Sequence, residues 1–395
     1  MSNTYRIGDE IEATVEKIVP RGLGLAFAAD LTILVPLAVP GDRVRLRLTD
    51  VKKRLAFVEI VEVRAPGPQR IAPPCEYFGR CGGCDFQQMS YDAQLAAKAG
   101  IIRDCLHRIG KIEYEAEIPV IPSPTEFGYR SRARWHIDRD KKTLGYFARD
   151  THDVVDIASC PILTPGLNSA LGKIRRELDW DSIWSERSEI DAAASDDGVT
   201  SVFSAEMAES TSDLSVAANA DTYAFSAATF FQANRSLIES LIEAAVGDAS
   251  GNIAFDLYSG VGLFAVPLAR KFEKLVAVEE NLAAIEFAKR NVANAALTNV
   301  RLVSQGVGRF LAENQKTQVD FVLLDPPRSG TEKRTIPAIA ALKPADISYV
   351  SCEPSILARD LRILLDAGYK IDKITGIDLF PQTHHVETVV RLSLT

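Results

Sequence analysis

At 395 residues the chain exceeds what one ordinary hydrophobic core organises, so we expect two or three domains. Apolar residues make up 47% and charged residues 25%, and no apolar run approaches the roughly 20 residues that cross a bilayer, which excludes a typical membrane protein. The net charge of −8 argues against a protein that binds and covers nucleic acid without sequence specificity. The N-terminus has no apolar signal core, so the sequence predicts a cytoplasmic protein without a membrane partner.

The first 64 residues alternate apolar and polar positions in short runs, and glycine and proline separate these runs. Several short strands with such turns predict a small β-barrel, and Pro66-Gly67-Pro68 predicts a linker after it. Basic residues cluster around Arg43, Arg45 and Arg47. Such a cluster is typical either of a phosphate-binding patch or of a solvated face, and charge alone leaves both open.

Four of the six cysteines form a three-plus-one set: Cys75-x5-Cys81-Gly-Gly-Cys84, with Cys160-Pro161 far downstream. In a cytoplasmic protein a close cluster indicates metal binding or catalysis more often than disulfides. Zinc and [4Fe–4S] clusters both accept four thiolates, and the three-plus-one spacing favours iron–sulfur while zinc remains an alternative. Cys105 lies beside an apolar helical stripe and is interpreted as a packing residue.

The middle of the chain predicts mixed structure. A helix is expected over residues 90–110, with an apolar stripe at Tyr91, Leu95, Ala99, Ile102, Leu106 and Ile109. Residues 130–165 indicate β-structure, where alternation places Arg130, Arg132 and Arg134 on one sheet face that could hold phosphates. Residues 181–222 show little periodicity and are interpreted as an irregular or hairpin excursion.

From residue 236 onward helices and strands alternate. Strands are expected at 253–257, 275–279, 300–304, 321–324, 347–351, 371–377 and 387–394, and helices at 236–246, 263–271, 281–295 and 355–367. Repeated βα units predict a doubly wound parallel sheet whose last two strands form a hairpin. The fold class is therefore α/β, with an N-terminal barrel at 1–64, a central α+β domain at 65–225 and a catalytic domain at 226–395.

A glycine turn follows the first of these strands, in the sequence Asp256-Leu-Tyr258-Ser-Gly260-Val-Gly262. Such glycines allow a tight turn and close approach of backbone to a ligand, and Glu279 at the end of the next strand can accept hydrogen bonds from ribose hydroxyls. The third glycine that a pyrophosphate needs is missing, and no phosphate-binding lysine follows. The loop therefore fits S-adenosylmethionine better than NAD or ATP.

Asp325-Pro326-Pro327-Arg328 follows another strand, and its two prolines fix a rigid turn. Methyltransferases of exocyclic amines have a similar motif followed by an aromatic residue that stacks on the base. Arg328 takes that place here, which weakens the amine interpretation and leaves Asp325 free to bind substrate or cofactor.

Cys352 and Glu387 are each a polar residue in a mostly apolar stretch of sequence. Cys352 comes just before a predicted helix, whose N-terminus would favour a thiolate. Carbon 5 of uracil becomes nucleophilic when a thiolate adds to carbon 6, and a base must later remove the carbon-5 proton. One cysteine and one carboxylate are the minimum set for this chemistry. Beside the cofactor loop, the pair predicts covalent catalysis on a pyrimidine ring.

With these motifs in order, the chain resembles the RNA uracil-C5 methyltransferase family over nearly its full length. The resemblance implies a TRAM-like RNA-binding barrel, a [4Fe–4S] cluster on Cys75, Cys81, Cys84 and Cys160, nucleophile Cys352 and base Glu387. It implies S-adenosylmethionine contacts from Gln232, within Phe230-Phe231-Gln232-x-Asn234, and from Tyr258, Gly260, Gly262, Glu279 and Asp325. The family commonly has Asn where this chain has Glu353, which we expect to point outward, and often has Asn in place of Leu263.

A barrel and a cluster together are typical of the family members that act on ribosomal RNA, whereas bacterial transfer-RNA members usually lack both. The expected substrate is therefore 23S rRNA. No obligate protein partner is predicted. A tRNA uridine-C5 methyltransferase and an inactive RNA-binding assembly factor remain alternatives. Cytosine-C5 methyltransferases place their nucleophile in a different motif, commonly Pro-Cys, and Cys352 follows Ser351. Radical methylthiolation enzymes need Cys-x3-Cys-x2-Cys, which this sequence lacks.

Overall fold

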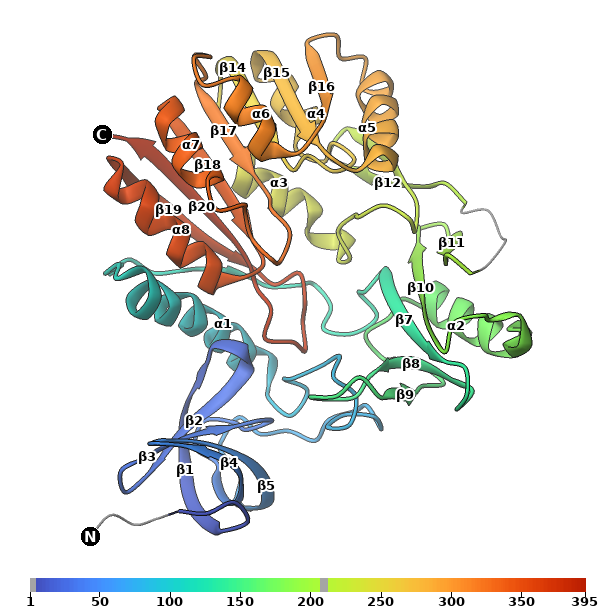
Figure 1. The fold of residues 1–395 in the computed structure, drawn as a ribbon, viewed down its shortest axis with the longest axis vertical. Helices are drawn as coiled ribbons and strands as arrows, with labels where there is room; N and C mark the ends of the chain where they lie inside the picture. The colour runs from blue at the N-terminus through green and yellow to red at the C-terminus, as the bar shows by residue number, and fades with distance from the viewer. Residues whose placement is uncertain (1–4, 207–211) are drawn as a thin grey trace.

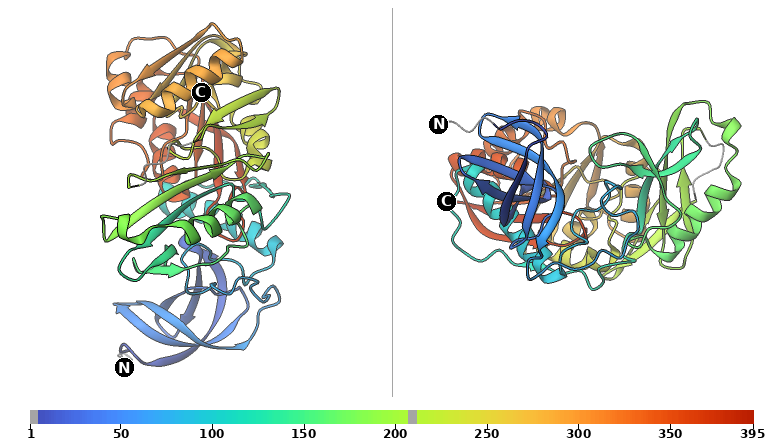
Figure 2. Two further views of the ribbon diagram at one scale, coloured as in Figure 1. Left: turned by 90° about the vertical axis from the view of Figure 1, so that its right-hand side faces the viewer. Right: turned by 90° about the horizontal axis from the view of Figure 1, so that it is seen from below.

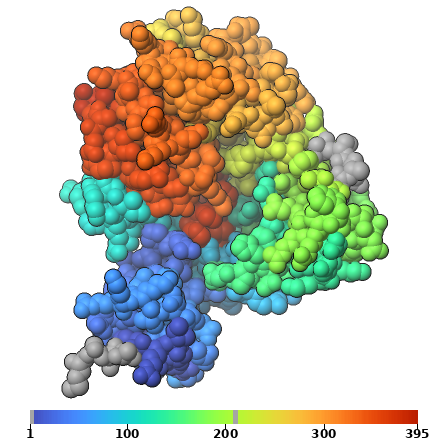
Figure 3. Space-filling model, in the orientation of Figure 1, coloured from blue at the N-terminus to red at the C-terminus, as the bar shows by residue number. Residues whose placement is uncertain are grey.

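The computed structural model describes residues 5–206 and 212–395. A barrel lies at one end of the long axis, an eight-stranded sheet with its helices occupies the other end, and a smaller five-stranded sheet lies beside them (Figure 1). The space-filling view shows the barrel projecting from the remainder as a separate lobe (Figure 3). The predicted boundaries at residues 64 and 225 stay predictions.

The N-terminal barrel is closed by five strands in the order β1-β2-β3-β5-β4, which confirms the barrel expected from the sequence. Alternate side chains point inward, so that Val15, Ile33 and Leu46 are almost wholly buried. The strands are β1 (Glu10–Val19), β2 (Leu23–Ala28), β3 (Leu31–Val35), β4 (Arg43–Lys52) and β5 (Leu55–Ala65), with a short 3-10 turn at Pro20–Gly22.

The predicted linker is fastened to the barrel by a buried carboxylate. Asp42 is fully buried and accepts hydrogen bonds from the backbone N–H of Gly67 at 2.8 Å and from the guanidinium of Arg70 at 2.6 Å. A Cβ on Gly67 would lie 2.4 Å from the carbonyl oxygen of Pro40, so only glycine fits there. The barrel is therefore anchored to the chain that follows it.

The central region contains a five-stranded antiparallel sheet in the order β11-β10-β7-β8-β9. Its strands pack around Trp135 and against helix α2 (Pro165–Glu177), which Thr164 caps. The strands are β7 (Arg132–Asp138), β8 (Thr143–Phe147), β9 (Val154–Asp156), β10 (Arg187–Ala194) and β11 (Thr200–Phe203), and a 3-10 turn spans Trp180–Ser182.

The excursion expected over residues 181–222 forms strands in large part. It includes β10, β11 and β12 (Leu214–Ala218), and β12 makes a hairpin with β13 (Asp221–Phe225). Residues 207–211 of that prediction lie outside the described residues. The small alanine and serine side chains in these strands carry too weak a periodicity to reveal them from the sequence.

Helix α1 (Tyr91–Cys105) lies where the sequence predicted a helix and continues into a wider turn at Leu106–Gly110. Ile102 and Leu106 of the predicted apolar stripe are buried, but the remainder of the buried face differs from the prediction. Gln94 and Lys98 are fully buried, while Ile109 is 46% exposed. Hydrophobic periodicity could not identify a face on which two polar side chains are buried, because their burial depends on partners distant in the sequence.

The eight-stranded sheet has the order β16-β15-β14-β17-β18-β20-β19-β6. Neighbouring strands are parallel except that β20 runs antiparallel to both β18 and β19, which confirms the doubly wound sheet and its terminal hairpin. Its strands are β14 (Gly251–Leu257), β15 (Phe272–Glu279), β16 (Val300–Ser304), β17 (Phe321–Leu324), β18 (Asp346–Ser351), β19 (Tyr369–Ile377), β20 (Glu387–Leu394) and β6 (Val120–Ile121).

Two layers of helices cover this sheet, each with its own apolar core. The first layer holds α3 (Ile238–Val246), which follows a 3-10 turn at Arg235–Leu237, with α4 (Ala265–Ala269) and α5 (Leu282–Asn294). The second holds α1, α6 (Val307–Glu313), α7 (Thr335–Leu342) and α8 (Pro354–Asp366). Helices α6 and α7 were not predicted, and neither was β6, which the central region adds to the sheet beside β19.

Within the described residues no helix combines the length and the apolarity that a membrane-spanning helix requires. Figure 1 and the left view of Figure 2 place the cyan segment that carries α1 between the barrel and the eight-stranded sheet.

Candidate active site

The antiparallel strand β20 brings Cys352 and Glu387 together. Cys352 follows the last residue of β18, and Glu387 is the first residue of β20. The register pairs Ser351 with Thr388, so Cys352 and Glu387 lie opposite each other one step beyond that pair. An antiparallel strand begins at the sheet edge where its parallel neighbours end, and this places both side chains at the ligand-binding edge.

Two aspartates lie at the same edge. Asp256 is buried and is the second-last residue of β14, and Asp325 follows β17 directly. Burial raises the pKa of Asp325 to about 7. Burial, followed by the charges of Asp325 and Glu279, raises the pKa of Asp256 well above its usual value. Burial, followed by the charge of Asp325, likewise raises the pKa of Glu387. Buried carboxyl groups that repel one another's negative charge tend to stay protonated near neutral pH.

The thiol of Cys352 lies among groups that oppose the thiolate expected from the helix N-terminus. Burial and then the charge of Glu387 raise its pKa to about 12, although the guanidinium of Arg328 opposes them. Helix α8 also has a carboxylate of its own at its N-terminus, because Glu353 accepts hydrogen bonds from the backbone N–H of Ser355 at 3.4 Å and from its hydroxyl at 2.7 Å. Glu353 thus turns toward the helix.

Arg328 is a site residue whose role the sequence reasoning missed. It is exposed, it lowers the pKa of both Cys352 and Glu387 against the effect of burial, and its guanidinium lies 6.0 Å from the ring centre of Phe380. Its position in the Asp-Pro-Pro-Arg turn was the available signal, but only the sheet order shows that this turn lies beside β18.

The glycine loop after β14 has the conformation that its composition predicts. Tyr258, Gly260 and Gly262 have φ values of 64°, 55° and 92°, and a Cβ on Gly260 would project into open space. Glu279 accepts a hydrogen bond from the N–H of Gly260 at 2.9 Å, and the hydroxyl of Tyr258 donates to Glu332 at 2.5 Å. The loop therefore leaves room for a ligand in front of Gly260.

Several buried polar atoms at this edge have no hydrogen-bond partner within the described part of the chain. They are both carboxylate oxygens of Asp256 and one side-chain oxygen each of Ser259, Glu387 and Thr388. The side-chain oxygen of Gln232, ahead of helix α3, also has no partner among the described residues. Gln232 is 4% exposed, whereas Phe230 two residues earlier is 63% exposed. Buried polar atoms are almost always satisfied in a folded protein, so this group indicates a place where ligands supply the missing partners.

Two of the three arginines expected to hold phosphates, Arg130 and Arg132, bond to groups inside the protein. Arg132 donates to the carbonyl oxygens of Ser226, Ala227 and Thr229, and to that of Ala227 at 2.9 Å, which fixes the segment leading to Gln232. The Arg130 side chain donates to the carbonyl of Arg132 at 3.0 Å and lines the cysteine pocket. Arg134 forms an ion pair with Asp191 at 3.0 Å.

This part of the prediction is wrong for Arg130 and Arg132, because alternation within one strand does not reveal which elements cover its face. The arginines of the barrel are also paired with other groups of the protein. Arg45 and Arg47 form ion pairs with Glu10 at 3.0 Å and 3.1 Å, which favours the solvated-face interpretation of that basic cluster.

Cys75, Cys81, Cys84 and Cys160 all line one cavity of about 80 Å³, together with Tyr77, Arg130 and Tyr146. Burial raises the pKa of Cys81 and Cys84, and raises that of Cys160 to about 11. Among the described residues no three Cys, His, Asp or Glu side chains form a group that could hold a metal ion, so the metal site stays a prediction. Cys105 is 1% exposed in the apolar core, as a packing residue should be.

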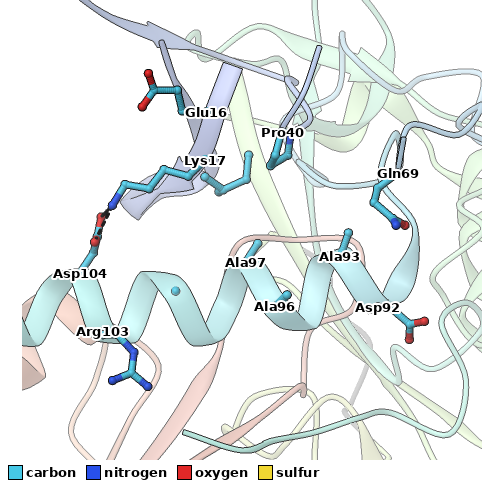
Figure 4. A pocket seen from close by; sticks show the side chains of 12 residues that line it. Glu16, Lys17, Pro40, Gln69, Asp92, Ala93, Ala96, Ala97, Arg103 and Asp104 are labelled. Carbon is cyan, nitrogen blue, oxygen red and sulfur yellow. Dashed lines mark hydrogen bonds and ion pairs between the residues drawn. The ribbon is translucent and has the colours of Figure 1, made fainter. Parts of the chain in front are cut away.

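A cavity of about 590 Å³ lies away from these residues, between β1 and α1 (Figure 4). Ala93, Ala96 and Ala97 form its floor, and the ion pair between Lys17 and Asp104, 2.8 Å long, closes one end. None of the predicted site residues lines it, so the cavity separates the barrel from the helix without adding to the candidate active site.

Known proteins resemble this chain at the level of sequence and of fold. The family model of tRNA (uracil-5-)-methyltransferases matches residues 200–395. The chain is 30% identical to the 23S rRNA (uracil(1939)-C(5))-methyltransferase RlmD of Shewanella sediminis, across 100% of this chain and 98% of the relative. It is 29% identical to an uncharacterized RNA methyltransferase of Thermosynechococcus vestitus, across 99% of both.

Among solved structures, the tRNA (uracil-54, C5)-methyltransferase of Pyrococcus abyssi in complex with S-adenosyl-L-homocysteine matches with a TM-score of 0.72 and 25% identity. The match covers 97% of this chain and 100% of that one. Because a relative of this family is 30% identical across 100% of this chain and the family model matches residues 200–395, the chain belongs to the RNA uracil-C5 methyltransferase family.

Proposed function

We propose that this protein methylates carbon 5 of a uridine in 23S rRNA, with S-adenosylmethionine as methyl donor, in the cytoplasm. The observation that carries the proposal is the pairing of Cys352 and Glu387 one step beyond the last residue pair of β18 and β20. The adjacent glycine loop and the unpaired buried oxygens at this sheet edge support a ligand site beside them. The relative from Shewanella sediminis supports the ribosomal substrate.

In the proposed reaction the thiolate of Cys352 forms a bond to carbon 6 of the flipped-out uracil, and the electron pair of the ring double bond moves toward carbon 5 and oxygen 4. Carbon 5 would then form a carbon–carbon bond to the electrophilic methyl group that bound S-adenosylmethionine supplies, while the bond from that methyl group to sulfur breaks and S-adenosylhomocysteine leaves. Glu387 then accepts the proton of carbon 5, the ring double bond re-forms, and the Cys352 thiolate leaves.

The electrostatics of the site suit these steps. Arg328 favours the thiolate of Cys352 through its positive charge. The raised pKa of Glu387 makes its carboxylate a stronger proton acceptor than that of an exposed glutamate, once the carboxyl has released the proton that it favours holding near neutral pH. We assign cofactor contacts to Gln232, Tyr258, Gly260, Gly262, Glu279 and Asp325.

A test uses unmodified 23S rRNA and tRNA transcripts with labelled S-adenosylmethionine, followed by mapping of the labelled nucleoside. Label at carbon 5 of one 23S rRNA uridine is expected, and Cys352→Ala should abolish it. Transcripts containing 5-fluorouridine should be trapped on the wild-type protein, because fluorine cannot leave as a proton does. A fully active Cys352→Ala variant would refute the mechanism, and bound cofactor without any methylated product would favour an inactive assembly factor.

A tRNA uridine is the second candidate, because the Pyrococcus abyssi protein carries a tRNA name and matches 97% of this chain. The presence of the barrel and the central sheet therefore does not by itself separate the two substrates. Label in the tRNA transcripts alone would decide for this candidate.

We propose further that a [4Fe–4S] cluster binds Cys75, Cys81, Cys84 and Cys160. The four side chains line one buried cavity, which fits a four-thiolate ligand set. The three-plus-one spacing of the four cysteines favours a cluster over a single zinc ion, which is the alternative. Such a cluster would tie the loop of residues 75–84 to Cys160.

Anaerobic reconstitution with iron and sulfide, followed by iron and sulfide analysis and absorption spectroscopy, tests this assignment. Four irons and four sulfides per chain are expected. Zinc at one ion per chain, with no uptake of iron, would decide for the zinc alternative.

A further inference from the structure

The segment of residues 378–386 joins β19 to β20 and ends next to Glu387. We call it the connecting segment. It contains no helix or strand residues, so it depends on contacts with other parts of the chain for its conformation. These contacts come largely from the central region, namely from helix α1 and from the loop that holds the first three cysteines.

Helix α1 supplies two buried polar side chains. Gln94 donates to the side-chain oxygen of Gln382 at 3.0 Å and accepts from the backbone N–H of Gln382 at 2.9 Å. Lys98 forms a buried ion pair with Asp378 and donates to the carbonyl oxygen of Phe380 at 3.0 Å. Both side chains are fully buried, which explains why this face of α1 is not apolar.

The cysteine loop holds the connecting segment through the residue that follows Cys84. The backbone N–H groups of Asp85 and Phe86 donate to the carbonyl oxygen of Gln382 at 2.9 Å and 3.0 Å. The carboxylate of Asp85 lies 2.6 Å from Nδ1 of His384. His384 is three residues before Glu387, so a short path of bonded groups joins the cysteine pocket to the candidate base.

Two further groups tie the same path to the pocket. Arg149 donates to the carbonyl oxygen of Cys84 at 2.8 Å and to the carboxylate of Asp85 at 3.1 Å. The hydroxyl of Tyr129 donates to the carbonyl oxygen of Pro381 at 2.9 Å, and the Tyr129 ring packs in one cluster with Cys84. Cys84 and the connecting segment therefore share their neighbours.

We propose that Asp85 is a positioning residue that joins the four-cysteine pocket to the connecting segment, so that filling of the pocket sets how readily Glu387 removes the proton. This inference rests on the proposed function. The cysteine loop has turns and isolated bridges in place of regular structure, and a loop of this kind becomes rigid when its side chains are fixed to a common centre. Fixing Cys84 fixes Asp85, and Asp85 holds His384.

The first test separates positioning of the base from a general loss of structure. Asp85→Asn keeps the size of the side chain and removes its charge. The matched control is Asp150→Asn, because Asp150 is exposed and has a φ of 62°, a conformation that asparagine adopts as readily. Both variants are reconstituted with iron and sulfide and mixed with uridine-containing transcripts, and the covalent protein–RNA adduct and the released product are followed by rapid quenching.

We expect Asp85→Asn to form the adduct at the wild-type rate and to release product about tenfold more slowly, so that adduct accumulates. Tenfold corresponds to about 1.4 kcal/mol in the barrier for proton removal. The Asp150→Asn control should match the wild type. Equal slowing of adduct formation and release would indicate a merely structural role and overturn the proposal, and so would wild-type kinetics in Asp85→Asn.

The second test does not depend on methylation, so it distinguishes failure of this inference from failure of the proposed function. Hydrogen–deuterium exchange of peptides from residues 378–386 is compared between protein reconstituted with iron and sulfide and protein with an empty pocket. We expect at least tenfold faster exchange in the empty protein, with peptides of β14 unchanged as an internal reference. Unchanged exchange in the connecting segment would overturn the proposal, as would a pocket that takes up no iron.

Discussion

Replacement of Lys98 by methionine tests how strongly the connecting segment depends on helix α1. The side chains of Lys98 and Asp378 are both 0% exposed, and the second oxygen of Asp378 has no partner within the described residues. Lys98→Met leaves that carboxylate buried without a counter-charge, which costs about 3–5 kcal/mol, and it also removes the donor to the carbonyl of Phe380. Because neither group can reach water, we expect a value near the middle of this range, about 4 kcal/mol.

A double variant shows whether the uncompensated charge is the cause. In Lys98→Met/Asp378→Leu no charge remains in the cavity, and apolar replacement of a buried ion pair is often neutral or stabilising. We therefore expect the double variant to recover most of the stability that the single variant loses. The measurement is urea unfolding followed by tryptophan fluorescence, which reports on the central region because all three tryptophans lie at positions 135, 180 and 184.

The control for this cycle is Lys17→Met, which also removes a lysine paired with an aspartate of α1. The Lys17 side chain is 45% exposed in its pair with Asp104, so a change below about 1 kcal/mol is expected. The reasoning would be refuted if Lys98→Met lost no more stability than Lys17→Met, or if the double variant were as unstable as the single one.

Three further predictions concern Asp256, Arg328 and Cys105. Burial raises the pKa of Asp256, so the folded state binds the proton of this carboxyl more tightly than the unfolded chain does. The protonated carboxyl therefore contributes to the stability of the folded state fully below about pH 4, and this contribution is lost as pH rises. Asp256→Asn should therefore raise the midpoint of urea unfolding at pH 8, change it little at pH 4, and weaken S-adenosylmethionine binding measured by calorimetry. Arg328→Gln should raise the pKa of Cys352 further and slow adduct formation with 5-fluorouridine RNA at pH 7 by about tenfold, and an unshifted pH–rate profile would count against this role of the guanidinium. Cys105→Ala should cost about 1–2 kcal/mol in urea unfolding through lost packing, and loss of bound iron in this variant would contradict the assignment of Cys105 as a packing residue.

The sequence predicted the barrel, the doubly wound sheet and the strand ends that carry Asp256, Glu279, Asp325 and Cys352. Period-2 and period-3.6 patterns and glycine turns are local properties, and strand ends in a parallel sheet converge on one edge whatever the remaining details. For the same reason the hairpin of β19 and β20 was predictable, since no helix separates the two strands.

Other features depended on neighbours that lie far away in the sequence. The buried polar face of α1 exists because Gln94 and Lys98 meet residues about 280 positions later. Arg132 donates its hydrogen bonds within the protein because the segment that contains Ala227 packs beside β7. The strand β6 joins the catalytic sheet although it lies more than 200 residues before β19. No pattern within a single element could indicate these partners.

The sequence by itself determined which side chains stand at the ends of the catalytic strands and which cysteines form a set, because spacing and turn chemistry fix both. Only the tertiary structure decided the register that sets Cys352 against Glu387, the turn of Glu353 toward α8, and the burial that raises the pKa of the thiol and of the carboxyl groups. These properties arise from the packing of separate elements, and the energy of a buried charge depends on all the groups around it, wherever they occur along the chain.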